Sequence, residues 1–133
     1  MENPSIMNHV SVGVSDLDRA TGFYYEVLAT IGASRQHEAP NAVAYGKLFP
    51  EFWVQLPHDG GSPGAANGVH FAFFANSKDE VQAFYDTAVR LGGRDGGTPG
   101  QRPEYGEPYY GCFVYDLDGH KIEATYWDAP PPA

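Results

Sequence analysis

One pattern occurs twice in this chain, and a repeat of this length restricts the fold more than any other feature of the sequence. Each copy has an apolar segment headed by a histidine, then a segment with helical spacing, then a glycine. His9 and His70 are 61 residues apart (70 − 9 = 61). The same offset of 61 relates Phe23-Tyr24 to Phe84-Tyr85 and Gly32 to Gly93. We interpret this as a duplicated supersecondary unit, in which both histidines occupy equivalent positions.

Each copy starts with the same order of elements. Valines at 10, 12 and 14 alternate with small residues, which indicates a strand with one buried face. Ser15 is a candidate N-cap for the helix that follows, and Ser77 begins a capping box in the second copy. Two short strands, 42–46 and 51–56, complete the first copy, and the hairpin 109–127 completes the second. Residues 94–108 are rich in glycine and proline and predict a long loop.

The length of 133 residues suits a single domain, made of repeats at about 7–56 and 69–127 that share one core and are joined by a Gly/Pro-rich linker. A formal net charge of −9 disfavours nucleic acid as a partner. The N-terminus lacks a signal-peptide pattern, and no apolar run is long enough to span a bilayer. We therefore expect a cytoplasmic protein without a membrane partner. Cys112 is the single cysteine and reads as a small core residue.

Three side chains could form a metal site. Helices bury their apolar faces on one side of a sheet, so His9 and His70 should face the other side. Glu123 alternates with Ile122 and Ala124, and it lies opposite an apolar face as well. Two histidines and one carboxylate form a known metal-ligand set with open positions for substrate. The alternative is that both histidines are structural, hydrogen-bonded residues and that Glu123 lies on a solvated face.

The motifs in this chain resemble those of the vicinal oxygen chelate superfamily, which includes glyoxalase I, extradiol dioxygenases, fosfomycin-resistance transferases and bleomycin-resistance proteins. The resemblance extends from His9 to Glu123 and is most specific in its last run. The residues that carry it are His9-Val10-Ser11-Val12-Gly13-Val14-Ser15-Asp16, Phe23-Tyr24, His70, and Asp116-Leu117-Asp118-Gly119-His120-Lys121-Ile122-Glu123.

The resemblance implies an α+β fold of two βαβββ modules, which form a curved mixed sheet around a cup-shaped cavity with the helices outside. It implies that His9, His70 and Glu123 hold a divalent metal ion (Zn, Fe, Ni or Mn), and that the protein is a homodimer. The expected function is a metal-dependent enzyme of the lyase, isomerase or dioxygenase type, acting on a small oxygen-chelating molecule. The alternative is a metal-free protein that binds a small molecule or sequesters an antibiotic.

This chain differs from individual members of the superfamily, and these differences narrow the possible activities. Glyoxalase I has a fourth ligand in the last strand of the first module, where an alignment of the two hairpins puts Gln55. Dioxygenases use a tyrosine as hydroxyl donor, for which Tyr105, Tyr109 and Tyr110 are candidates, with Tyr105 and Tyr110 taken as catalytic beside Glu123. Fosfomycin-type enzymes need a cationic pocket, and here Arg102 is the main candidate. Trp53, Arg102 and Tyr105 are the expected substrate contacts, unless Arg102 only supports its loop through backbone hydrogen bonds.

Overall fold

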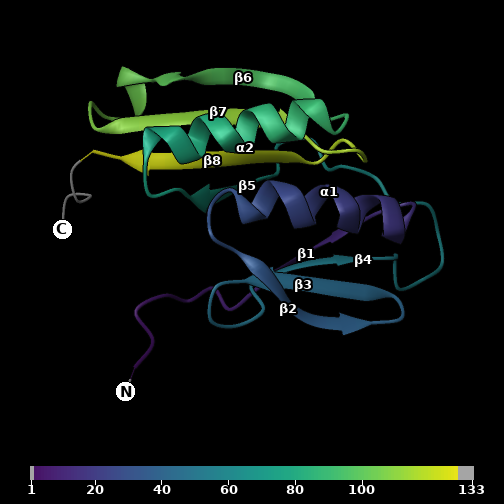
Figure 1. Cartoon of the computed structure of the whole chain (residues 1–133). Coiled ribbons are helices and arrows are strands. Elements are labelled where there is room, and N and C mark those ends of the chain that lie inside the picture. The colour runs from purple at the N-terminus through teal and green to yellow at the C-terminus, as the bar shows by residue number, and fades with distance from the viewer. Residues whose placement is uncertain (1, 129–133) are drawn as a thin grey trace.

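The computed structural model describes residues 2–128, which form two α-helices, one short 3-10 helix and eight strands. Figure 1 shows how they are arranged. The first module comprises β1 (Val10–Gly13), α1 (Leu17–Ala29), β2 (Ser34–Ala39), β3 (Ala42–Gly46) and β4 (Phe52–Gln55). The second comprises β5 (His70–Phe74), α2 (Lys78–Arg90), β6 (Arg94–Gln101), the short 3-10 helix η1 (Pro103–Tyr105), β7 (Tyr109–Tyr115) and β8 (Lys121–Trp127). Neither helix is long and apolar enough to cross a membrane.

The strands form two mixed sheets with the same topology. Their orders are β1-β4-β3-β2 and β5-β8-β7-β6, and in each sheet the first strand pairs in parallel with the last one of its module. The predicted α+β class with two βαβββ modules is therefore confirmed. The two sheets remain separate and do not close into one continuous barrel, since β1 and β5 each have a single neighbour in their own sheet.

Both helices lie on the same side of the sheets and contact one another (Figure 1). Each buries its apolar stripe on the sheet of its own module, with Phe23 and Phe84 almost fully buried. Ser77 caps α2 as predicted, because its hydroxyl accepts a hydrogen bond from the Glu80 amide. The cap predicted for α1 is wrong by one residue. The residue that caps α1 is Asp16, whose carboxylate accepts from the Arg19 amide, while Ser15 bonds elsewhere.

The loop predicted for residues 94–108 is wrong over its first half, which forms the edge strand β6. Glycines permit a strand here because large neighbours occupy the space where side chains would be. A Cβ atom on Gly97 would lie 2.9 Å from Arg102 Nη2 and 3.1 Å from Phe113 Cδ2. The pairing of β6 with β7 shifts register on both sides of Gly97, which is typical of an edge strand with bulges.

The turn between β7 and β8 connects the two modules. The Tyr24 hydroxyl donates to Asp116 Oδ2 at 2.5 Å, and Asp118 Oδ1 accepts from both the amide and the hydroxyl of Ser15 at 2.9 Å. His120 Nε2 lies 2.6 Å from the Gly13 carbonyl oxygen. Burial, reinforced by the negative charge of Asp116, raises the pKa of the Tyr24 phenol well above 10.0. The D-x-D-G-H run therefore fixes how the second module sits on the first.

Candidate functional site

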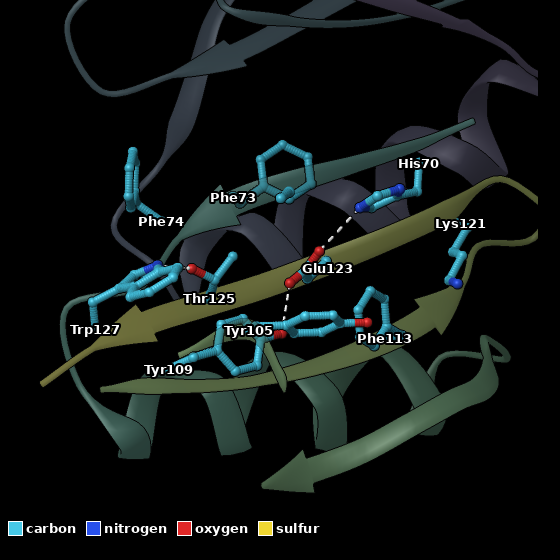
Figure 2. A pocket seen from close by; sticks show the side chains of 11 residues that line it. His70, Phe73, Phe74, Tyr105, Tyr109, Phe113, Lys121, Glu123, Thr125 and Trp127 are labelled. Atoms are coloured by element: carbon cyan, nitrogen blue, oxygen red, sulfur yellow. Dashed lines mark hydrogen bonds and ion pairs between the residues drawn. The ribbon is translucent and has the colours of Figure 1, made fainter. Parts of the chain in front are cut away.

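The second sheet carries a cavity of about 470 Å³ on the face opposite α2. Side chains from β5, β7, β8 and η1 line it, and Figure 2 shows them around Glu123, which lies near the middle. Most of the lining is aromatic, and its ionisable members besides two tyrosines are His70, Lys121 and Glu123. The cavity has a size typical of small-molecule sites.

Strand register brings the polar residues of the cavity together. Glu123 pairs with Ala72 on one side and with Phe113 on the other, so His70 lies one diagonal position away on β5. Tyr109 enters β7 four residues before Phe113, and its ring reaches Glu123 by lying across Gly111. Any Cβ atom at Gly111 would clash with the Tyr109 phenol group. A glycine is therefore required at position 111 for this arrangement.

Glu123 is a buried carboxylate with two side-chain partners, drawn as dashed lines in Figure 2. Its Oε1 atom lies 3.1 Å from His70 Nε2, and its Oε2 atom accepts a hydrogen bond of 2.5 Å from the Tyr109 hydroxyl. Burial, followed by this bond and the charge of the carboxylate, raises the pKa of the Tyr109 phenol above 10.0. Tyr109 therefore remains a protonated donor and holds one carboxylate oxygen, while the other faces His70.

His9 does not join this group. Its ring is exposed, with Nδ1 2.6 Å from Asn8 Oδ1 and an edge contact with Trp53 at 6.2 Å between ring centroids. Within residues 2–128, no three His, Cys, Asp or Glu side chains are placed so that they could hold one metal ion. From the sequence, the modules could pair within one chain or between two, and within one chain His9, His70 and Glu123 do not meet. The two modules of one chain stay apart at the faces that carry these residues, and only His70 and Glu123 are adjacent.

The register also changes the assignment of Gln55. Trp53 pairs with Ser11 in the first sheet as Glu123 pairs with Ala72 in the second, and Ser11 and Ala72 are related by the 61-residue offset. Trp53 thus occupies the position equivalent to Glu123, and Gln55 lies two residues farther along β4. The alignment that put Gln55 opposite Glu123 is wrong because it was anchored on the apolar residues of the hairpins and not on strand pairing.

Trp53 lies between two imidazole rings. His9 contacts it from the side of β1, and His37 of β2 lies at 5.5 Å between ring centroids. In the second module, the equivalent of the pair of His9 and Trp53 is the pair of His70 and Glu123. The repeat therefore keeps a histidine in both modules, but it places an aromatic ring beside one and a carboxylate beside the other.

Arg102 supports the chain and does not face the cavity. Its guanidinium donates to the carbonyl oxygens of Thr98, Gly100 and Gly111 at 2.9, 3.2 and 2.7 Å. It also lies 5.3 Å from the centre of the Phe113 ring. The geometry therefore supports the second of the two roles considered from the sequence, in which Arg102 orders its own segment and the adjacent β7.

The tyrosines separate into two groups. Tyr105 and Tyr109 line the cavity, with their ring centroids 5.1 Å apart. Tyr110 lies on the opposite face of β7 and packs against the core. The centre of its ring lies 5.3 Å from Lys78 Nζ of α2. A catalytic role for Tyr110 is therefore not supported, because alternation along the strand turns its ring away from Glu123.

Sequence reasoning gave no role to several cavity residues, among them Phe113, Lys121 and Trp127. One signal could have found the last two. Lys121, Glu123, Thr125 and Trp127 alternate along β8, so all four must lie on the face that carries Glu123. Tyr109 was considered as a hydroxyl donor, but nothing in the sequence showed that Gly111 lets its ring reach Glu123.

Two βαβββ modules, with a histidine and a glutamate in a cavity on the second sheet, define the fold class that the motifs indicated. A sequence model of the Glyoxalase/Bleomycin resistance protein/Dioxygenase superfamily matches residues 6–124, and the chain belongs to this superfamily. A search of curated proteins found no match.

Solved structures agree with this assignment. A glyoxalase/bleomycin resistance protein from Albidiferax ferrireducens T118 is 30% identical, with a TM-score of 0.85 over 91% of this chain and 98% of that chain. A glyoxalase-related enzyme from Fulvimarina pelagi is 19% identical, with a TM-score of 0.70 over 92% and 88% of the two chains. A lactoylglutathione lyase from Agrobacterium tumefaciens is 21% identical, with a TM-score of 0.64 over 94% and 95%. The last two show similarity of fold.

Proposed function

We propose that this protein is a divalent-metal-dependent cytoplasmic enzyme that acts on a small oxygen-chelating molecule, and that its site is completed in a homodimer. His70 and Glu123 of one chain would hold the metal ion together with His9 of a second copy. The observation that carries the proposal is the contact of 3.1 Å between His70 Nε2 and Glu123 Oε1 in an open cavity.

The donor set fits a first-row divalent ion. Imidazole nitrogen and carboxylate oxygen bind such ions at about 2.0–2.2 Å, which separates two ligand atoms by roughly 3.3 Å in tetrahedral geometry. The observed separation of 3.1 Å between His70 and Glu123 needs little adjustment. Tyr109 supplies an outer hydrogen bond that fixes the carboxylate, as is common around metal-binding side chains.

A second copy accounts for the position of His9. The face of the first sheet opposite α1 presents exposed His9 and partly exposed Trp53 and Gln55, with no other element of the same chain over them among the described contacts. If this face covered the cavity of a partner, His9 would complete a set of three ligands. Trp53 would line the substrate-binding space. Gln55 lies two residues beyond Trp53 on β4, so it would lie farther from the metal ligands than a residue at position 53.

The residues of the cavity have distinct roles in this proposal. When bound, the metal ion would supply Lewis-acid stabilisation of a substrate oxyanion. Glu123 would bind the ion through Oε1, which faces His70, while Tyr109 holds the other carboxylate oxygen, Oε2. Tyr105 is 52% exposed at the cavity and is the hydroxyl free to donate a proton to the substrate, since the Tyr109 hydroxyl is already bonded to Glu123. The aromatic lining gives the reacting atoms a largely apolar surrounding.

Elemental analysis tests the metal. Protein purified without a metal-affinity tag should carry about one equivalent of Zn, Fe, Ni or Mn per chain, or take it up on addition. His70→Ala should lose it, whereas His58→Ala, which changes an exposed histidine in the linker, should retain it. An empty site that takes up none of these four ions would refute the proposal.

A mixing experiment tests the homodimer. His9→Ala and His70→Ala chains each lack a ligand, but a heterodimer of the two regains one complete site if ligands come from both copies. Random reassociation of equal amounts should restore about a quarter of the metal content per chain. No recovery in a reassociated sample in which a tag on one variant pulls down the other would show that the three ligands do not combine across subunits.

A metal-free binding protein is the second candidate. Six of the eleven residues that line the cavity are aromatic rings of Phe, Tyr or Trp, and the chain carries a net charge of −9. Such a lining suits a flat apolar molecule even without a metal ion. This candidate is favoured if metal uptake fails and if Glu123→Gln leaves ligand affinity unchanged, because then the carboxylate would serve only the hydrogen bond from Tyr109.

A further inference from the structure

The side chains that β8 contributes to the cavity are charged at one end and apolar at the other. Lys121, Glu123, Thr125 and Trp127 point into it in sequence order, and Figure 2 shows Lys121 beyond His70 at one end and Trp127 beside Phe74 at the other. A strand rises about 3.3 Å per residue, so the Cα atoms of Lys121 and Trp127 are roughly 20 Å apart. A ligand that lies along the strand would therefore meet a cation, the pair of His70 and Glu123, and then an aromatic surface.

Lys121 is a cation without an ion-pair partner among residues 2–128. The ion pairs of the described chain involve Arg35, His70, Lys78 and Arg90. The ammonium group of Lys121 instead lies 4.7 Å from the centre of the Phe113 ring, which positions the charge through a cation–π contact and leaves its hydrogen atoms available. In a chain with a net charge of −9, a lysine kept beside the candidate metal ligands indicates a negatively charged ligand group.

The opposite end of the cavity is unusually apolar for an exposed surface. Phe74 is 73% exposed, although it sits in a strand, and the ring of Trp127 lies near it (Figure 2). The Trp127 indole N–H is satisfied within the protein, because it donates to Thr125 Oγ1 at 2.8 Å. What this end offers a ligand is therefore aromatic surface without an unmet hydrogen-bonding group.

We propose that the substrate is an arylalkyl carboxylate, whose carboxylate binds Lys121 while its aromatic ring lies against Phe74 and Trp127. The proposal rests on the function proposed above, because it names the substrate class of that same cavity. The reacting oxygen atoms would then lie between the two ends, next to His70 and Glu123.

Calorimetric titration with three probes tests the proposal on the intact protein. The probes are 5-phenylpentanoate, its neutral amide 5-phenylpentanamide, and pentanoate, which lacks the ring. We expect the acid to bind roughly tenfold or more tightly than the amide. Lys121→Met should abolish this preference, and Lys121→Arg should retain it. Lys78→Met is the matched control, because Lys78 also lies over an aromatic ring but outside the cavity. This substitution should leave the affinities for all three probes unchanged.

The aromatic end is tested with Phe74→Ala, which removes an exposed side chain and should leave the fold intact. It should weaken 5-phenylpentanoate severalfold and pentanoate hardly at all. A variant that alters subunit association but leaves both affinities unchanged would overturn the proposal, since Phe74 would then serve the dimer. A higher salt concentration should weaken binding of the acid to the wild type and leave binding of the amide unchanged. This tests the contribution of charge without a substitution.

Metal content measured on the same samples separates the two proposals. A preference for the acid that depends on Lys121 in protein that binds no metal supports the substrate class and refutes the metal-dependent function. Stoichiometric metal content, with equal affinity for the acid and the amide in the wild type, supports the metal-dependent function and refutes the substrate class.

Discussion

Tyr109→Phe is the most informative single change, because it removes one oxygen atom from the centre of the site. The Tyr109 side chain is 2% exposed and Glu123 is 6% exposed, and their hydrogen bond of 2.5 Å joins a phenol to a carboxylate. A hydrogen bond to a charged group contributes about 1.5–3 kcal/mol to stability. The ring itself remains, so its packing against Tyr105 and Trp127 is retained.

We expect Tyr109→Phe to lower the free energy of unfolding by about 1.5–2 kcal/mol, the lower part of that range, because the open cavity lets water reach the Glu123 oxygen. For a chain of this length, that corresponds to a fall in Tm of roughly 5–8 °C. Apparent metal affinity should fall about 10-fold to 100-fold, because the carboxylate loses the partner that orients it.

Urea denaturation, followed by circular dichroism, measures the first effect on metal-free protein, and competition with a chelator measures the second. Tyr110→Phe is the matched control, because Tyr110 neighbours Tyr109 but lies on the other face of β7. A loss of stability equal to that of the control, with unchanged metal affinity, would refute the idea that Tyr109 orients Glu123.

The remaining predictions concern residues around the site and in the core. Gly111→Ala should destabilise the fold and lower metal affinity as Tyr109→Phe does, because the added methyl group displaces the phenol; equal affinity to the wild type in a chelator competition would contradict this. Arg102→Met should lower Tm by several degrees without changing ligand affinity, because three backbone carbonyl oxygens lose a charged donor; a change in affinity alone would restore Arg102 to the site. Burial raises the pKa of the Cys112 thiol to about 12, so native protein should resist thiol reagents at pH 8 and react only when unfolded. The raised pKa values of Tyr24 and Tyr109 mean that above about pH 10 the unfolded chain loses protons that the folded chain keeps, so stability should decline as pH rises through that range, and urea midpoints that stay constant from pH 9 to 11 would disprove it.

The fold could be predicted because its signals are local and repeated. Alternating valines, two capped helices with apolar stripes and a constant offset of 61 residues all indicate the same pair of modules. The polar strand β2 and the glycine-rich strand β6 could not be identified this way. Their residues have low strand propensity, and edge pairing with β3 and β7 decides their conformation.

Only part of the candidate site could be predicted from the sequence. Alternation placed Glu123 and His70 on one face, and the structure brings them together. The choice between Gln55 and Trp53 depended on strand register, which hydrophobic alternation cannot fix across a loop of uncertain length. The separation of His9 from Glu123 depends on how two modules sit on each other, and no local pattern carries that information.

The turn between β7 and β8 makes the covalent linker dispensable for holding the halves together. Asp116, Asp118 and His120 belong to the second half of the chain but find their partners in the first, at Tyr24, Ser15 and Gly13. A protease cut in the exposed segment 58–62 would leave these contacts and the helix packing intact. Two such fragments should copurify as a noncovalent pair, whereas the second half alone would expose the part of α2 that packs on α1 and leave Asp116 without the Tyr24 phenol.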